Sequence, residues 1–208
     1  RVAILGKVGA GKSTLLRLLA GQSIATKGKV IIDGVDLAHI DPRDVRRQVG
    51  FLSQDSRLFF GTLRQNLMLG HPNATEAELL QALRISGALS MVQQDAASLD
   101  RLINEGGRGL SGGQRQMVLL SRLIVRNPQI VLLDEPTASM DEQLEAQVIR
   151  QLHQWLTGRT LVLVTHRPAL LNLVDRIVVM ENGKVIADGP RDQLINQAQR
   201  NSNVASVA

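Results

Sequence analysis

An octapeptide near the start of the chain has the spacing of a phosphate-binding loop. Residues 6–13 read Gly-Lys-Val-Gly-Ala-Gly-Lys-Ser, which matches the pattern G-x-x-x-x-G-K-S/T. Glycines let successive backbone N–H groups turn inward around a polyphosphate, because no side chains block the approach. Lys12 then supplies a positive charge for the β- and γ-phosphate oxygens, and Ser13 a hydroxyl ligand for Mg²⁺. The residues expected to bind nucleotide are Gly6, Lys7, Val8, Gly9, Ala10, Gly11, Lys12, Ser13 and Thr14.

A second group of small residues lies about a hundred positions further on. It reads Leu110-Ser111-Gly112-Gly113-Gln114 and has the composition of a helix start, which is another place where an anion binds readily. One phosphate loop is enough for a chain to bind one nucleotide. The pentapeptide therefore raises the question of whose phosphate it would hold.

Two adjacent carboxylates end an apolar stretch, Ile130–Leu133, that has the character of a buried strand. In a parallel sheet the carboxyl ends of the strands line the crevice where ligands bind. We expect Asp134 to hold Mg²⁺ through its water shell and Glu135 to face the γ-phosphate. A carboxylate in that position polarises the attacking water. The alternative is a strand end with solvated acids, and the phosphate loop in the same chain argues against it.

Gln54 and His166 also follow apolar stretches directly, Val49–Ser53 and Thr160–Thr165. A neutral Gln54 at a strand end would be a ligand of Mg²⁺ or would orient water, and His166 would donate to the γ-phosphate. Together with Lys12 and Glu135 they form the predicted catalytic set, while Ser13, Gln54 and Asp134 form the predicted metal set. The other three histidines are interpreted as structural.

The elements around the loop have the order that phosphate binding requires. Arg1–Leu5 is typical of a buried strand, and residues 13–20 have helical composition with Gly21 placed to end the helix. Asp33-Gly34 predicts a hairpin turn, and Asp41-Pro42 predicts the start of a short helix.

Beyond residue 62 the pattern becomes helical. A capping box at Thr75 predicts a helix over Glu76–Ser86, and a second box at Ser111 predicts a helix through Val125. The remaining predictions are strands at Gln129–Leu133 and Thr160–Val164, a helix at Glu142–Trp155, a hairpin turn at Asn182-Gly183 and a terminal helix from Pro190.

These elements predict an α/β fold of the P-loop NTPase type. It has a mostly parallel sheet, antiparallel hairpins and an inserted α-helical subdomain. The expected division is a core over 1–58 and 127–198, a helical subdomain over about 59–126 and a disordered tail over 199–208. Because the chain opens directly inside its first strand, we expect it to be part of a longer protein.

The amino-acid composition limits the class of protein to which the chain can belong. The chain has 208 residues, no Cys, 44% hydrophobic and only 2% aromatic residues, so aliphatic side chains must fill its core without a disulfide framework. A net charge of +5 from scattered residues favours anionic ligands but not nucleic acid. No apolar run approaches the roughly 18–20 residues of a membrane span, and no signal peptide is recognisable.

Taken together, the stretches that carry this chemistry resemble the nucleotide-binding domain of ABC transporters, in order and spacing, over essentially the whole chain. They are Gly6–Ser13, Gln54, Leu110–Gln114, Ile130–Glu135, Ala138–Asp141 and His166. The resemblance implies ATP and Mg²⁺ as cofactors and a head-to-tail homodimer that sandwiches two ATP molecules. Each ATP would contact the loop of one copy and Leu110, Ser111, Gly112, Gly113, Gln114 and Asp141 of the other. Ser111 and Asp141 would also cap helices.

Further stretches resemble the exporter type of this family. Leu58–Leu67 has the exporter pattern, and residues 102–109, 135–141 and 165–171 are similar to the LapB-like ATPases of type I secretion. This implies a domain at the cytoplasmic face of the bacterial inner membrane that powers export of a large adhesin-like protein. The implied partners are a transmembrane domain of the same polypeptide and the membrane-fusion and outer-membrane components of the secretion system. The alternatives are a domain of a drug, lipid or peptide exporter, an importer ATPase, or a soluble ABC ATPase without a membrane partner.

Three positions depart from the family pattern. The adenine-stacking aromatic lies before the phosphate loop in the family, and this chain contains no Tyr. Stacking on a base contributes about 1–3 kcal/mol, so this chain alone is expected to bind nucleotide more weakly. Asn104 or Gly107 stands where an acid is usual, and Met140 replaces the commoner Leu.

Overall fold

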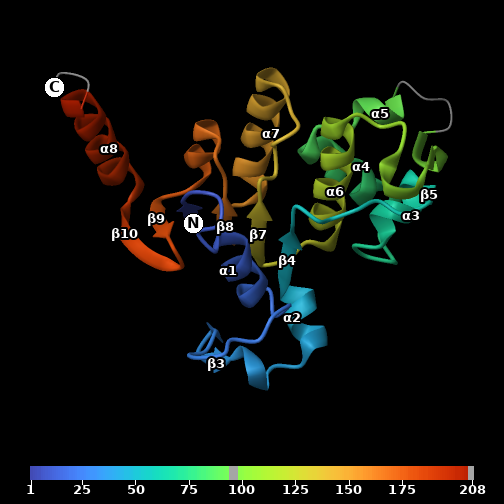
Figure 1. Ribbon diagram of the computed structural model, residues 1–208. Helices are drawn as coiled ribbons and strands as arrows, with labels where there is room; N and C mark the ends of the chain where they lie inside the picture. The colour runs from blue at the N-terminus through green and yellow to red at the C-terminus, as the bar shows by residue number, and fades with distance from the viewer. Residues whose placement is uncertain (94–97, 206–208) are drawn as a thin grey trace.

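The computed structural model describes residues 1–93 and 98–205, and its centre is a six-stranded sheet (Figure 1). The strand order is β10-β9-β1-β8-β7-β4. All neighbouring strands run parallel except β10, which is antiparallel to β9. The strands are β1 (Val2–Leu5), β4 (Val49–Leu52), β7 (Ile130–Asp134), β8 (Thr160–Val164), β9 (Arg176–Glu181) and β10 (Lys184–Pro190). The mostly parallel α/β sheet expected from the sequence is confirmed.

The parallel strands are apolar because helices cover both faces of the sheet. Alternate residues of β7 point to opposite faces. Leu132 belongs to a cluster with Leu16 of α1 (Lys12–Leu19) and residues of α2 (Pro42–Gln48), whereas Leu133 belongs to a cluster with Leu152 of α7 (Glu142–Trp155). The 3₁₀ helix η4 (Pro168–Leu173) also contributes to the second cluster.

A group of helices lies beside the β4 edge of the sheet (Figure 1). Its members are α3 (Leu63–Met68), α4 (Glu76–Ser86), α5 (Ser90–Gln93) and α6 (Gly112–Arg126), with the short segments β5 (Gly61–Thr62), η2 (Ser98–Asp100), β6 (Leu102–Ile103) and η3 (Glu105–Gly107). Capping boxes open α3, α4 and α6. The hydroxyls of Ser86 and Ser121, 2.6 Å apart and buried, join α4 to α6.

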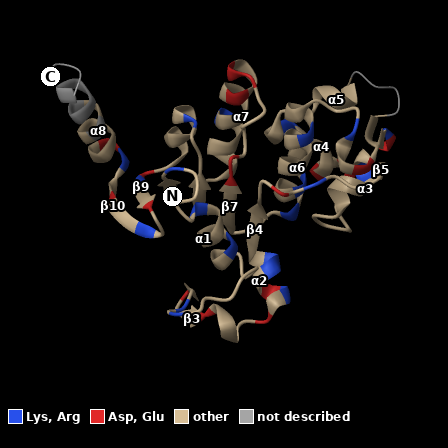
Figure 2. Cartoon of the chain, in the orientation of Figure 1, with Lys and Arg blue, Asp and Glu red and all other residues tan. Residues whose placement is uncertain are grey.

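The remaining elements are the hairpin of β2 (Ile31–Ile32) and β3 (Val35–Asp36), the 3₁₀ helix η1 (Leu37–His39) and the terminal helix α8 (Arg191–Ala205). Lys and Arg lie on separate elements, including α1, α2 and α6, while acidic residues mark the end of β7 and the start of α7 (Figure 2). None of the helices within the described residues combines the length and apolar character that crossing a bilayer requires.

The structure differs from the sequence-based expectation in several short segments and at both ends of the terminal helix. The pair β5–β6 was not expected, because strands of two residues carry no periodic pattern. Helix α8 begins at Arg191 and not at Pro190, since Pro190 is still paired with Arg176 in the sheet. It then continues through Ala205, so 199–205 are helical where disorder was expected, and no Gly or Pro interrupts that stretch. Residues 206–208 of the expected tail lie outside the described residues.

Gly50 lets helix α6 lie close to strand β4. A Cβ atom at this buried position would lie 2.5 Å from Leu123 Cδ1 and 2.5 Å from Pro128 Cγ. A larger side chain at this position would require the Leu123 side chain and the Pro128 ring to shift. The contact joins the last turns of α6, which contain Leu123, to β4.

We predict that Gly50→Ala lowers the free energy of unfolding by about 1–3 kcal/mol, as overpacking of a filled core does. The matched control is Gly189→Ala in β10, where the nearest atom to an added Cβ is Leu194 Cγ at 3.8 Å. Chemical denaturation of both variants measures the difference. Equal stabilities would show that α6 has room to retreat from β4.

Candidate functional site

The loop between β1 and α1 has a backbone that only glycine permits. Gly6 has a φ of 154°, and a Cβ atom there would lie 2.2 Å from the carbonyl oxygen of Met180. Gly11 caps α1 with a φ of 93°, in the left-handed region that other residues rarely adopt. Residues 6–11 therefore curve tightly, as the sequence pattern requires of a phosphate-binding loop.

Lys12 lies buried inside this curve. Its ammonium donates to the backbone oxygens of Gly6, at 2.6 Å, and Lys7, at 2.9 Å. Within the described residues no carboxylate forms an ion pair with Lys12, so two neutral carbonyls hold its charge. A phosphate group entering the loop would meet an uncompensated positive charge that is already fixed in place.

Strand β7 ends in two buried carboxylates, and the acidic end is visible in Figure 2. Asp134 is 3% exposed and Glu135 is 8% exposed. Among the described residues, neither Asp134 Oδ1 nor Glu135 Oε1 has a hydrogen-bond donor. A buried polar oxygen without a partner is costly. Both oxygens therefore fit a bound cation or a hydrogen-bond donor from a ligand.

Glu135 has the environment of a general base. Burial raises the pKa of its carboxyl group, and the positive charge that His166 carries when protonated works against that rise. His166 Nε2 lies 3.7 Å from Glu135 Oε1, and the Thr165 hydroxyl donates to Oε2 at 3.4 Å. A carboxylate with a raised pKa accepts a proton from water more readily than an exposed one.

One cavity of about 280 Å³ brings most of the predicted residues together. It is lined by Val8, Gly9, Ala10, Gly11, Lys12, Ser13, Thr14, Gln54, Asp134, Glu135, Val164 and His166. Gly6 and Lys7 form the base of the loop and are not among the lining residues. The loop follows β1, and the other polar residues follow β8, β7 and β4, which are consecutive neighbours in the sheet.

The donor atoms of this cavity suit a hard cation. Magnesium prefers oxygen ligands and binds proteins through one or two carboxylates plus phosphates and water. Ser13 supplies a hydroxyl, Gln54 an amide oxygen and Asp134 a carboxylate oxygen without a donor. The described residues contain no group of three or more His, Cys, Asp or Glu side chains that would hold a metal without such help.

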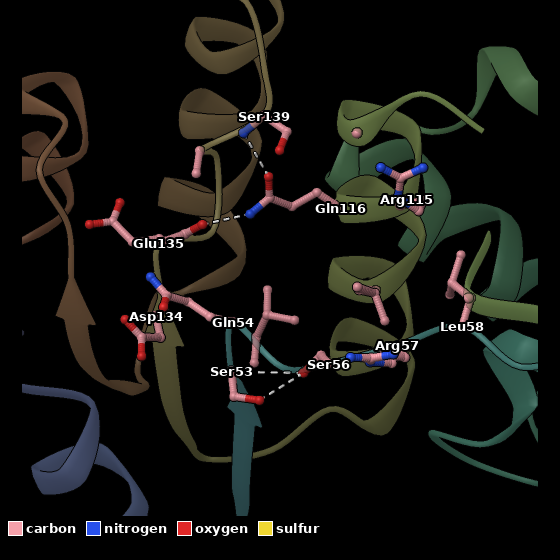
Figure 3. A pocket seen from close by; sticks show the side chains of 15 residues that line it. Ser53, Gln54, Ser56, Arg57, Leu58, Arg115, Gln116, Asp134, Glu135 and Ser139 are labelled. Atoms are coloured by element: carbon pink, nitrogen blue, oxygen red, sulfur yellow. Dashed lines mark hydrogen bonds between the residues drawn. The ribbon is translucent and has the colours of Figure 1, made fainter. Parts of the chain in front are cut away.

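The residues expected to act on a second nucleotide lie elsewhere. Ser111 and Gln114 form the capping box of α6. The Gln114 N–H donates to Ser111 Oγ at 3.1 Å, and the Ser111 N–H donates to Gln114 Oε1 at 2.9 Å. Asp141 Oδ1 caps α7 by accepting from the Leu144 amide at 2.8 Å. Neither Asp141 nor any residue of 110–114 lines the loop cavity. Gly112 lines a neighbouring cavity of about 450 Å³. Gln54, Asp134 and Glu135 line this cavity as well (Figure 3).

Two interactions at the site were not found from the sequence. Gln116 reaches from α6 to the backbone of Glu135 and Ser139 (Figure 3). Gln116 follows Gly113 by three residues and Gly112 by four, so it lies on the same face of the helix as the two glycines. This spacing is the sequence feature that could have indicated its role. Arg17 of α1 also pairs with Asp55, next to Gln54, at 2.6 Å. No local pattern marked that pair.

Comparison with known proteins gives concordant matches. The family model described as ABC transporter matches residues 1–138. The alpha-hemolysin translocation ATP-binding protein HlyB of Escherichia coli is 36% identical over 198 residues, covering 95% of this chain and 28% of that protein. The cyclolysin secretion/processing ATP-binding protein CyaB of Bordetella pertussis is 38% identical over 194 residues, covering 93% and 27%.

A solved structure agrees with these matches. The structure of a bacterial Atm1-family ABC exporter with ATP bound has a TM-score of 0.90 to this fold. It is 33% identical in sequence and covers 95% of this chain and 35% of that one. The chain thus spans less than a third of the length of the curated relatives it matches.

We predict that Glu135→Gln stabilises the domain in the absence of nucleotide and metal. The substitution removes a buried charge without a hydrogen-bond partner at Oε1, so the midpoint of thermal unfolding should rise by about 2–4 °C. Calorimetry at neutral pH measures the change.

The matched control is Glu142→Gln, which removes an exposed charge from the first turn of α7. A carboxylate there interacts favourably with the helix dipole, so this variant should be slightly less stable. A midpoint that falls in Glu135→Gln would show that the contacts of the carboxylate with His166 and Thr165 outweigh the cost of its burial.

Proposed function

This chain belongs to the ABC transporter family of ATPase domains, and we propose that it binds and hydrolyses ATP to drive export across the bacterial inner membrane. The observation that carries the proposal is the single cavity that joins the glycine loop and Lys12 to Gln54, Glu135 and His166. A fixed cation, a tightly curved glycine loop and a buried carboxylate are parts that phosphoryl transfer to water needs.

In this proposal the loop amides and Lys12 bind the β- and γ-phosphates. Ser13, Gln54 and Asp134 hold Mg²⁺, which neutralises charge on the phosphate oxygens when bound. Glu135 orients the attacking water and accepts its proton, which its buried position favours. His166 donates to the γ-phosphate and stays next to Glu135 through the 3.7 Å contact.

We further propose that two copies of the domain act head to tail. Residues 111–114 do not line the loop cavity of their own chain, and the Ser111 side chain is exposed. The start of α6 has N–H groups suited to an anion, so it is available to the nucleotide of a second copy. Leu110, Ser111, Gly112, Gly113, Gln114 and Asp141 would then complete the partner's site.

The proposed physiological role is type I secretion. HlyB is named as an ATP-binding protein for the translocation of alpha-hemolysin, and CyaB as one for the secretion and processing of cyclolysin. By similarity, this domain would sit at the cytoplasmic face of the inner membrane and serve a transmembrane domain of the same polypeptide. Membrane-fusion and outer-membrane components would complete the system, with a large adhesin-like protein as cargo.

We predict that Glu135→Gln forms a stable dimer in Mg-ATP. Without the base, the bound ATP persists and keeps the two copies together. Size-exclusion chromatography with light scattering should show a doubled mass in Mg-ATP and a single mass without nucleotide.

The control is the double variant Lys12→Ala/Glu135→Gln, which lacks the loop cation and should stay monomeric. If Glu135→Gln remained monomeric with Mg-ATP at high protein concentration, the nucleotide sandwich would be wrong.

We predict that Ser111→Arg abolishes both cooperative ATP turnover and protein secretion in the intact assembly, with kcat falling by about 100-fold or more. The bulky side chain would block the partner's phosphate. Ser111→Asp separates this effect from lost helix capping, because Asp is an equally good N-cap but repels phosphate. Both variants should lose turnover, while Ser111→Thr should retain it. Unchanged cooperative turnover in Ser111→Arg would contradict the proposal.

A further inference from the structure

Gln116 joins helix α6 to the segment that carries the catalytic carboxylate (Figure 3). Its amide nitrogen donates to the backbone oxygen of Glu135 at 2.5 Å, and its amide oxygen accepts from the Ser139 N–H at 3.0 Å. Both polar ends of one half-buried side chain are therefore used. The two bonds span a five-residue stretch, 135–139, from a single point on α6.

The first turn of α6 packs tightly against the same stretch. A Cβ atom at Gly112 would lie 3.0 Å from Ser139 Cβ, and one at Gly113 would lie 3.0 Å from the Ser139 carbonyl oxygen. The two glycines thus bring the α6 backbone close enough for Gln116 to reach residues 135 and 139. Their small size serves this internal contact as well as any contact with phosphate.

Arg167 also holds the stretch 135–139, through contacts that do not involve α6. The Arg167 guanidinium donates to the Ala138 carbonyl oxygen at 2.9 Å and lies 3.4 Å from the Glu145 carboxylate. Ala138 and Ser139 are themselves exposed, so polar contacts hold their backbone: those of Arg167, the bond from the Ala138 N–H to the Glu135 carbonyl at 3.3 Å, and the bond to Gln116.

The backbone of Glu135 needs such support. Its φ of 52° lies in the left-handed region, which is strained for a residue with a side chain. Its N–H donates to the Val164 carbonyl at 2.9 Å, and its carbonyl accepts from Gln116 at 2.5 Å and, at the longer distance of 3.3 Å, from the Ala138 N–H. These bonds constrain the backbone from which the carboxylate projects, and the Thr165 hydroxyl contacts the carboxylate itself. Loss of the bond from Gln116 would leave the Glu135 carbonyl with only the longer bond from Ala138.

We propose that Gln116 is a positioning residue that couples the two nucleotide sites of a dimer. Through this side chain, a shift of α6 caused by the partner's nucleotide at residues 111–114 changes the orientation of Glu135 in the chain's own cavity. The coupling rests on the head-to-tail dimer proposed above. The bonds from Gln116 to residues 135 and 139 do not depend on it.

The test compares two substitutions in the full-length protein. Gln116→Met keeps length and volume but loses both hydrogen bonds. Gln116→Glu keeps the acceptor for the Ser139 N–H but loses the donor to the Glu135 carbonyl. The control is Gln147→Met, the same chemical change at an exposed position of α7.

We expect both Gln116 variants to lower kcat by about 10- to 100-fold, because small displacements of a catalytic group have effects of this size. The KM for ATP should change by less than about twofold, and the Hill coefficient should fall toward one. If Gln116 had a purely structural role, its substitution would not lower kcat and the Hill coefficient while leaving KM nearly unchanged. Gln147→Met should match the unmodified protein in all three quantities.

Hydrogen exchange of residues 136–141 tests the contact without any turnover. In Gln116→Met, exchange at the Ser139 amide should be about three- to tenfold faster, as expected for one lost hydrogen bond. In Gln116→Glu it should stay near the original rate.

If hydrogen exchange at the Ser139 amide were unchanged in Gln116→Met, the hydrogen bond from Ser139 to Gln116 would be wrong. If kcat and the Hill coefficient were unchanged in both Gln116 variants, the proposed coupling between the two nucleotide sites would be wrong. If the unmodified protein hydrolysed no ATP while the exchange difference was present, the proposed function would be wrong and the contact correct.

Discussion

The site depends on the burial of two carboxylates at the end of β7. Asp134 and Glu135 are almost inaccessible to solvent, yet each has one oxygen without a hydrogen-bond donor among the described residues. Burying a charge without partners is unfavourable, so the fold must recover this cost from the rest of its core or from a ligand. Lys12 lies at the same cavity and supplies a positive charge that a ligand can share, and His166 adds a ring nitrogen beside Glu135. The arrangement gives a bound phosphate and its cation a larger stabilising effect than a solvated site would.

Helix α6 contacts the segment that follows β7, at whose end these carboxylates lie. Glu135 has a strained backbone, and helix α6 holds it through Gln116 while Gly112 and Gly113 permit the close approach. Helix α6 is in turn placed by Gly50 of β4 and by its own packing against α4. One helix therefore carries both the exposed start that is proposed to bind an anion and an internal contact to Glu135, the proposed general base. In the proposed dimer, each chain would carry parts of two different sites that move together.

Much of the architecture follows from local signals in the sequence. Helices α4 and α7 begin and end where their caps predicted, because a Thr or Asp side chain satisfies the first amides wherever the helix lies in the fold. The strand–loop–helix at residues 1–20 follows in the same way from glycines and apolar runs. The pair β5–β6 and the length of α8 were missed because neither has a periodic pattern strong enough to read. Gln116 was missed because its partners lie 19 and 23 residues away in the chain.

The sequence by itself determined which side chains are available and which local backbone each one prefers. It placed Gln54, Asp134, Glu135 and His166 directly after apolar strands, and it placed Ser111 at the start of a helix. Only the tertiary structure decided that β1, β8, β7 and β4 are neighbours, which brings those side chains to one cavity and leaves Ser111 outside it. The physical reason is that caps and turns depend on residues a few positions apart, whereas strand order depends on pairings between distant segments that no local pattern encodes.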